Sequence, residues 1–167
     1  MEIAIKNLQS KIPINPKRIK RIILDTLSSE GVKKPASISV CFVNDKKIKE
    51  LNLRFLKRSG PTDVISFDLS AGTKEIVAEI AVSTDTAIRQ SKIYHTTYTY
   101  ETLLYVIHGL LHILGYDDRS ARQRKLMQEK TESILDSSRL GKTFILRARS
   151  LPAGRQGEDK SFASLEQ

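Results

Sequence analysis

Two histidines and an aspartate stand at a spacing that suits the binding of one metal ion. His108 and His112 are four residues apart, so on a helix their imidazoles project from the same face, about one turn apart. Asp118 follows His112 by six residues and lies beyond Gly115, where the chain can reverse direction. We therefore predict that His108, His112 and Asp118 bind one divalent metal ion through two nitrogens and one oxygen.

The alternative is that each histidine is an ordinary core residue, as a lone buried histidine usually is. Two histidines on an otherwise apolar helix would each cost about 1–3 kcal/mol if they were buried without a partner. A metal ion removes that cost, so the combination favours metal binding. Three protein ligands leave one position of a tetrahedral zinc ion open to water, which is typical of catalytic rather than structural zinc. The predicted reaction class is therefore hydrolysis.

The residue after the first histidine argues against a peptidase. In HExxH peptidases a glutamate at this position acts as general base, whereas this chain has Gly109. The chain is also basic, with 28 Lys and Arg against 19 Asp and Glu and a formal net charge of +9, so it attracts phosphate-rich partners. RNA is therefore the predicted substrate, although a solvated basic surface without a nucleic-acid partner would give the same charge.

Hydrophobic periodicity predicts the elements that must position these residues. The clearest helix covers Tyr98–Leu114, is apolar on most faces and therefore buried, and carries the metal site at its C-terminal end. Gly115 is expected to end it in a left-handed conformation. Other helices are predicted over Pro16–Leu27, from Asp45 as capping residue to Phe55, over Asp85–Ile93 and over Ser120–Leu135. Strands are predicted over Glu2–Leu8, Ile38–Val43, Val64–Phe67 and Glu79–Val82, with a turn at Gly72 between the last two.

Length and composition predict a single domain followed by a tail. The 167 residues suffice for one hydrophobic core, assigned to residues 1–137, and residues 138–167 are predicted to form a basic tail that is disordered or loosely docked. No apolar run is long enough to span a membrane, the N-terminus does not resemble a secretion signal, and the single cysteine, Cys41, has no disulfide partner. We expect a cytoplasmic protein without membrane contact.

Several blocks of the sequence resemble the YbeY family of bacterial rRNA maturation endoribonucleases. The segment His108–Asp118 resembles the family's signature, and Leu51-Asn52, Pro61–Phe67 and Glu79–Ser83 resemble its other blocks in the same order. The resemblance implies an α+β fold, with a small mixed four-stranded sheet packed with about five helices. It also implies a zinc ion held by three histidines, cleavage of single-stranded RNA, small-subunit rRNA 3′-end maturation and ribosome quality control.

Two positions depart from the family's pattern. Asp118 stands where the family has its third histidine; a carboxylate can still bind zinc, but it makes the site harder and more negative, so other divalent ions can compete. Leu56 stands where many members carry an arginine that serves catalysis or phosphate binding. Arg54, Lys57 or Arg58 is predicted to supply the missing positive charge for phosphate contacts.

Four further residues are candidates for the surroundings of the metal. The resemblance places Thr62, Asp63 and Ser66 at the site, although Thr62 and Asp63 equally suit a turn. Asp117 is expected either to orient a histidine or to cap the last helix, with capping preferred. His95 has no local geometry that favours a ligand role, so we expect a surface histidine.

Three functions are compatible with these features. The first is a metal-dependent endoribonuclease, with zinc as the expected ion and ribosomal RNA, ribosomes or pre-ribosomal particles as partners. The second is a ribosome-associated assembly factor in which the metal is structural and catalysis is weak or lost, as Leu56 and Asp118 would allow. The third, a metalloprotease, is disfavoured by Gly109. The oligomeric state is not predicted.

Overall fold

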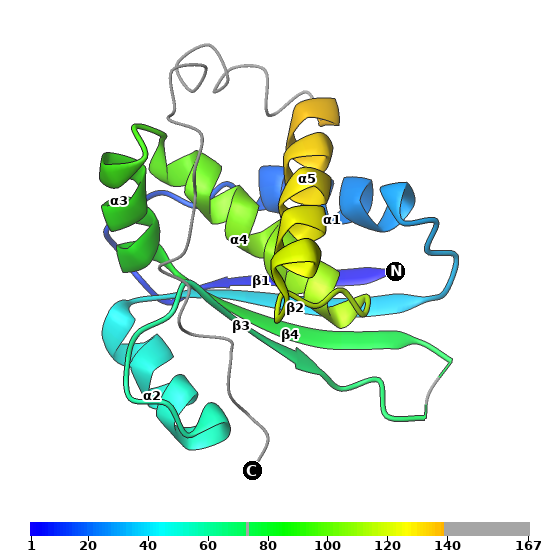
Figure 1. The fold of residues 1–167 in the computed structure, drawn as a ribbon. Coiled ribbons are helices and arrows are strands. Elements are labelled where there is room, and N and C mark those ends of the chain that lie inside the picture. The colour runs from blue at the N-terminus through cyan, green and yellow to red at the C-terminus, as the bar shows by residue number, and fades with distance from the viewer. Residues whose placement is uncertain (73, 139–167) are drawn as a thin grey trace.

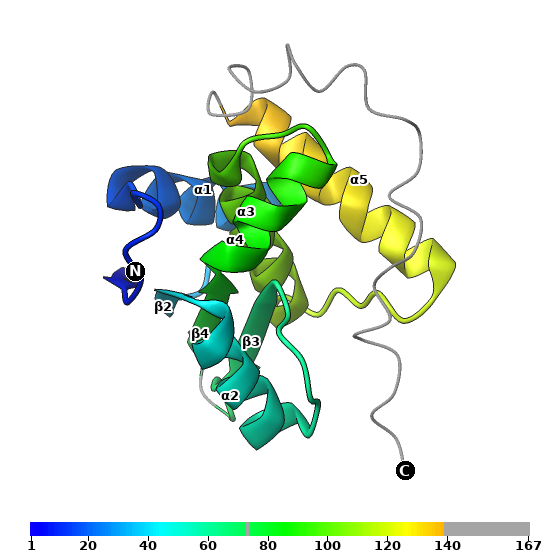
Figure 2. The same ribbon diagram turned by 90° about the vertical axis from the view of Figure 1, so that its left-hand side faces the viewer.

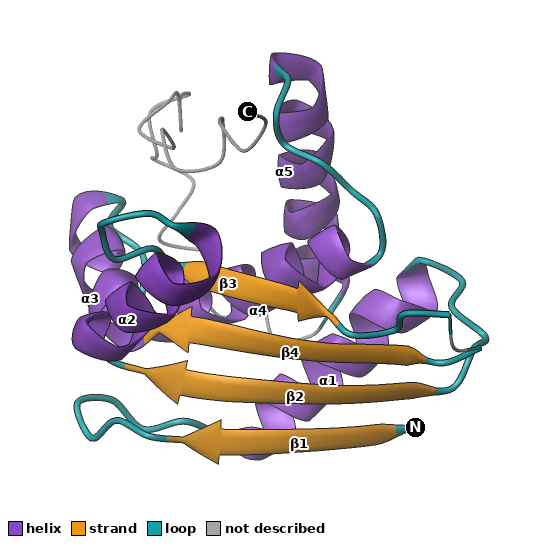
Figure 3. Ribbon diagram, turned by 90° about the horizontal axis from the view of Figure 1, so that it is seen from below, coloured by secondary structure: helices purple, strands orange, loops and turns teal. Residues whose placement is uncertain are grey.

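A mixed four-stranded sheet forms the centre of the fold. The computed structural model describes residues 1–72 and 74–138. Strands β1 (Glu2–Asn7), β2 (Ala36–Val43) and β4 (Ile76–Ser83) run parallel, and β3 (Val64–Asp68) pairs antiparallel with β4. The order across the sheet is β1-β2-β4-β3, so β3 is an outer strand (Figure 3). The predicted α+β class with a mixed four-stranded sheet is confirmed.

Five helices surround the sheet in the described part of the chain. They are α1 (Pro16–Ser29), α2 (Asp45–Leu56), α3 (Thr84–Ile93), α4 (Tyr98–Ile113) and α5 (Ala121–Ser137). Helix α4 crosses one face of the sheet between α1 and α5, whereas α2 lies on the opposite face near one end of the strands (Figures 1 and 2). The sheet therefore separates α2 from the helix that carries the two histidines.

The main core lies between the sheet and α4. Ile107, Leu110 and Leu111 of α4 are completely buried, because the helix is covered by the sheet on one side and by α1 and α5 on others. In β2 the alternate residues Ile38, Val40 and Phe42 face this core, as the two-residue period of a strand requires. A smaller cluster of Val43, Ile48 and Ile65 lies under α2 on the other face.

The predicted elements are present, but two capping assignments were wrong. Asn44, rather than Asp45, caps α2, because its side chain accepts a hydrogen bond from the Lys47 N–H. Ser120, rather than Asp117, caps α5 through a capping box with Gln123. Both corrections move the cap to the last residue with extended backbone before the helix, which is the position from which a side chain reaches the free N–H groups.

Ser138 is the last described residue, so the predicted tail falls almost wholly outside the described part of the chain. Ser138 itself is buried, and its hydroxyl donates to the carbonyl of Leu135 at the end of α5. The division into a domain of residues 1–137 and a tail therefore stays a prediction. None of the described helices is both long and apolar enough to cross a membrane.

Candidate metal centre

The two histidines project from the last turns of α4 with their Nε2 atoms facing each other. The Nε2 atoms of His108 and His112 are 3.1 Å apart, and the rings meet nearly edge-on, with centroids 4.7 Å apart and planes at 86°. Four residues make slightly more than one helical turn, so the two imidazoles lie one above the other on the same face. The predicted pairing of the two rings is thus present in the structure.

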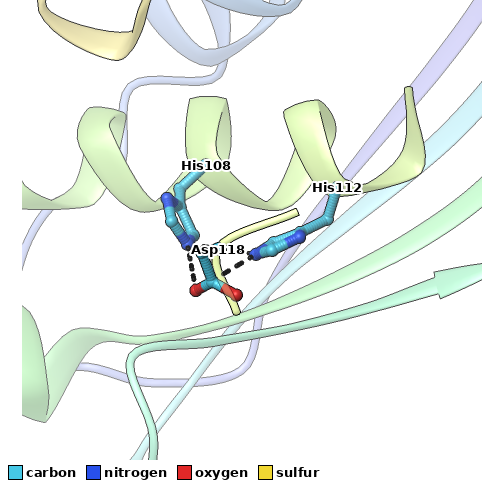
Figure 4. A group of neighbouring side chains, drawn as sticks. All are labelled: His108, His112 and Asp118. Atoms are coloured by element: carbon cyan, nitrogen blue, oxygen red, sulfur yellow. Dashed lines mark hydrogen bonds and ion pairs between the residues drawn. The ribbon is translucent and has the colours of Figure 1, made fainter. Parts of the chain in front are cut away.

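Asp118 completes a triangle of ligand atoms, because the chain reverses after α4. Gly115 has φ +92°, the left-handed conformation predicted at the end of this helix, and its N–H donates to the His112 carbonyl. The Asp118 Oδ2 atom then lies 3.8 Å from His108 Nε2 and 3.9 Å from His112 Nε2 (Figure 4). Asp118 is only 5% exposed, so its carboxylate is held at the site rather than in solvent.

The spacing and chemistry of these atoms fit a divalent metal ion. Ligands of a tetrahedral zinc ion lie about 3.3 Å apart, given metal–ligand bonds near 2.0–2.2 Å. The observed separations of 3.1, 3.8 and 3.9 Å bracket that value, so small side-chain rotations suffice to place all three atoms in the coordination shell. Two imidazole nitrogens and one carboxylate oxygen suit zinc and other borderline divalent ions.

Both histidines are prepared to act as neutral ligands. His112 Nδ1 lies 3.0 Å from the Tyr116 carbonyl, and because a carbonyl can only accept, Nδ1 carries the proton and Nε2 presents its lone pair. Burial, and secondarily the neighbouring His112, lower the pKa of His108 to about 3. His108 is therefore uncharged at neutral pH, as a metal ligand must be.

Hydrogen bonds to Asp117 and to Arg124 of α5 stabilise the loop that carries Asp118. The Asp117 carboxylate accepts hydrogen bonds from the backbone N–H groups of Asp118 at 2.7 Å and Arg119 at 3.1 Å. The guanidinium of Arg124 on α5 donates to the carbonyls of Asp118 and Arg119, at 2.9 and 3.1 Å. Asp117 therefore shapes the ligand loop instead of capping a helix.

Two residues that sequence reasoning missed, Glu30 and Lys130, stabilise the loop through Tyr116. The Tyr116 hydroxyl donates to Glu30 at 2.5 Å, and the Lys130 ammonium lies 2.8 Å from the same carboxylate and 5.1 Å from the Tyr116 ring centroid. Burial acts to raise the pKa of Glu30, but the hydrogen bonds from Lys130 and Tyr116 outweigh it and lower the pKa below its usual value. The carboxylate thus stays charged and fixes the residue whose carbonyl orients His112.

Gly109 lies where the helix touches the sheet most closely. A Cβ atom at this position would lie 2.6 Å from Ser66 Oγ, 2.9 Å from Val64 Cγ2 and 3.0 Å from Ile80 Cγ2, so no larger residue fits without a shift. Ser66 therefore lies beside the residue next to a metal ligand. Its hydroxyl is buried and has no hydrogen-bond partner among the described residues.

The remaining candidates lie between the last turn of α2 and the middle of β3. Thr62 donates to the Asp63 carboxylate at 3.0 Å, which also accepts from the Val64 N–H, a local arrangement typical of a turn. Arg54 lies in the last turn of α2, with Lys57 and Arg58 just beyond it. Their roles as phosphate contacts, and those of Thr62, Asp63 and Ser66 at the site, stay predictions.

Comparison with known proteins identifies the family. The family model "Endoribonuclease YbeY" matches residues 4–139, a region that contains all three candidate ligands. The chain belongs to the YbeY family. Curated YbeY proteins include one from Syntrophus aciditrophicus, 36% identical over 141 residues, which cover 80% of this chain and 88% of the relative. Another, from Desulforamulus reducens, is 32% identical over 152 residues, or 84% of this chain and 98% of the relative. Both are named endoribonucleases.

A solved structure has a similar fold. The solution structure of a Thermotoga maritima protein superposes with a TM-score of 0.53 and 24% sequence identity, covering 81% of this chain and 90% of that one. At this identity the similarity concerns the fold alone. The family match and the curated relatives confirm the resemblance that the sequence blocks predicted.

Proposed function

We propose that this protein is a metal-dependent endoribonuclease that hydrolyses single-stranded RNA. The observation that carries the proposal is the convergence of His108, His112 and Asp118 onto one point in a chain of the YbeY family. Three ligands leave a coordination position for water or substrate, which a structural site would close. Zinc is the expected ion, and the net charge of +9 favours a phosphate-rich substrate.

The protein's own residues would bind and orient the reactants. His108, His112 and Asp118 would hold the ion, which when bound supplies Lewis-acid polarisation and a more acidic water. The Tyr116 carbonyl keeps the proton on Nδ1 of His112, so that Nε2 stays a ligand. Arg54, Lys57 and Arg58, at the end of α2 and just beyond it, would hold RNA phosphates on the α2 side of the sheet, in place of the positive charge that Leu56 lacks.

The cellular role follows from the relatives rather than from the geometry. We infer that the substrate is ribosomal RNA, with the protein acting in small-subunit rRNA 3′-end maturation and ribosome quality control in the cytoplasm. Ribosomes or pre-ribosomal particles are the proposed partners. The family's endoribonuclease names and the basic charge of this chain support that inference.

The first experiment combines metal analysis with RNA cleavage. Purified protein should contain about one metal ion per chain and should cut a single-stranded RNA, with loss of cutting in chelator. His108→Ala should lose both metal and activity, whereas His95→Ala should change neither, because His95 is an exposed histidine outside the cluster. Unchanged zinc content in His108→Ala would refute the ligand assignment.

Asp118→His tests the third ligand separately. A histidine restores the ligand set that the resemblance implies, so zinc content should be kept or raised relative to the natural chain. Zinc content measured against manganese and magnesium under equal supplementation gives the selectivity. Lower zinc content in Asp118→His would mean that residue 118 is not a ligand.

A second candidate is a ribosome-associated assembly factor with a structural metal. The observation in its favour is Leu56, which packs into the apolar cluster of Val43, Ile48 and Ile65 and so offers no charge to a phosphate. This candidate predicts bound metal and intact RNA or ribosome binding without cutting. A peptidase is disfavoured further, because position 109 faces the sheet at a distance too short even for a Cβ atom.

A further inference from the structure

An aromatic ring lies exposed at the end of α2, surrounded by basic residues. Phe55 is 52% exposed, although Phe residues are usually buried, and it follows Arg54 and precedes Lys57, both exposed. The stretch between Glu50 and Asp63 contains three basic residues and no acidic residue. An exposed aromatic ring within a basic segment has the chemistry of a nucleic-acid contact, since bases stack on the ring while cations attract phosphates.

The Phe55 ring is held in place rather than mobile. It meets the Phe67 ring of β3 edge-on, with centroids 5.1 Å apart and planes at 71°, and the Arg54 guanidinium lies 5.3 Å from its centroid. Phe67 in turn packs against the small cluster of Val43, Ile48 and Ile65 under α2. A ring fixed in this way loses little freedom when a ligand stacks on it.

The segment after the ring is also fixed. Lys57 adopts a left-handed conformation with φ 56°, and the N–H of the next residue, Arg58, donates to the Asn52 carbonyl at 3.4 Å. The buried Asn52 side chain donates to the Gly60 carbonyl at 2.8 Å, which closes the loop that follows the helix. The basic side chains therefore project from a backbone of defined shape.

One strand connects this surface with the metal centre. Residues of β3 alternate between the two faces of the sheet: Val64 and Ser66 lie against Gly109 of α4, while Ile65 and Phe67 belong to the α2 side. β3 is the outer strand, and no further strand pairs with its other edge in the described part of the chain (Figure 3). The two surfaces are thus one strand apart.

We propose that Phe55, with Arg54 and Lys57 beside it, forms a stacking subsite for a base of single-stranded RNA, on the face of the sheet opposite the metal centre. This inference rests on the proposed function, because it takes RNA as the ligand. It adds a site that selects unpaired bases, since a base within a duplex has no free face to stack on the ring. The subsite would favour single strands independently of the cleavage chemistry.

Binding measured without cleavage tests the subsite. The chain contains no tryptophan, so Phe55→Trp introduces a single fluorophore at the proposed subsite. In chelator, to prevent cutting, its emission should be quenched saturably by a single-stranded RNA oligonucleotide but not by inorganic polyphosphate. Leu53→Trp, at a similarly exposed position on the same helix, is the matched control and should show little quenching.

RNA affinities of four variants separate the loss of stacking from misfolding. Phe55→Ala and Phe55→Leu should each bind the RNA about 5- to 150-fold more weakly than the natural chain. Leu53→Ala should bind normally, and His108→Ala should bind RNA normally while lacking metal. Phe55→Leu keeps an apolar side chain against Phe67, so equal RNA affinity in a folded Phe55→Leu protein would overturn the subsite. Failure of the natural chain to bind single-stranded RNA would instead overturn the proposed function itself.

Discussion

Replacement of Gly109 by alanine tests the close approach of α4 to the sheet. The added Cβ would lie 2.6 Å from Ser66 Oγ and 2.9 Å from Val64 Cγ2, both shorter than ordinary contacts. Overpacking of this kind costs about 1–3 kcal/mol. Alanine has a higher helix propensity than glycine, and this offsets about 1 kcal/mol of the overpacking cost. Because the Val64 and Ile80 methyls are anchored on strands and cannot swing away, we expect a net loss of about 1–2 kcal/mol.

Urea unfolding of metal-free protein, followed by circular dichroism, measures this loss. Gly60→Ala is the matched control, since nothing lies within 4 Å of its Cβ position, and it should be neutral or stabilising by about 0.5 kcal/mol. A Gly109→Ala protein that is more stable than the natural chain, by the amount expected from helix propensity alone, would refute the reasoning. It would mean that α4 lies farther from β3 than the structure shows.

A double-mutant cycle with Ser66 identifies the atom responsible. Ser66→Ala removes the closest atom and also a buried hydroxyl without a described partner, so alone it should stabilise the protein by about 1 kcal/mol. Gly109→Ala should then cost less in the Ser66→Ala background, with a coupling energy of at least about 0.5 kcal/mol. Simple additivity of the two changes would show that Ser66 is not the limiting contact.

Three further predictions concern acid stability, a helix cap and the metal. Hydrogen bonds from Lys130 and Tyr116 hold the pKa of Glu30 below 4.5 in the folded protein, against the effect of burial. The charged carboxylate therefore contributes to the free energy of unfolding above pH 4.5, and this contribution is lost as the pH falls through the lower pKa of the folded state. Glu30→Gln should therefore lower the free energy of unfolding at pH 7 by about 1–2 kcal/mol. In urea unfolding, the difference in this free energy between pH 7 and pH 4 should be smaller in the variant than in the natural chain. An equal difference in the two proteins would contradict this. Asn44→Ala should lower the free energy of unfolding by about 1 kcal/mol in the same assay, and an unchanged free energy would show that another residue caps α2. Chelator should lower the melting temperature of the natural chain, since ion at 100 times its dissociation constant stabilises by about 2.7 kcal/mol, and should leave His108→Ala unchanged.

The metal centre could be predicted from the sequence because its geometry is local. The separation of His108 and His112 fixes their relation once the helix is assigned, and Gly115 supplies the left-handed residue that turns the chain back toward Asp118. All three ligands lie within one helix and the loop after it. Helical periodicity and a single turn rule therefore sufficed to bring them together.

The support of the centre could not be predicted, because it depends on residues far apart in the chain. Glu30 contacts Tyr116 across 86 positions and Lys130 across 100, and nothing in the local pattern of α1 marks Glu30 as the partner. The strand order β1-β2-β4-β3 brings Ser66 beside Gly109, and that order is a property of the whole sheet. The capping errors at Asp45 and Asp117 arose where another polar residue within three positions, Asn44 or Ser120, could also serve, and only backbone conformation distinguishes the candidates.

Gly109 determines both how closely α4 packs on the sheet and which side chain can stand next to His108. In the sequence it indicates only that the glutamate of a peptidase is missing, but in the structure it is the residue that lets α4 approach Val64 and Ser66. A glutamate at this position would have to displace side chains from two strands, so this helix cannot carry both its present packing and a general base next to His108. A proton acceptor for hydrolysis therefore does not stand at position 109, where peptidases of the HExxH type carry it. Ser66, which borders the same residue from β3, shows that the sheet packs directly against the helix that carries the two histidines.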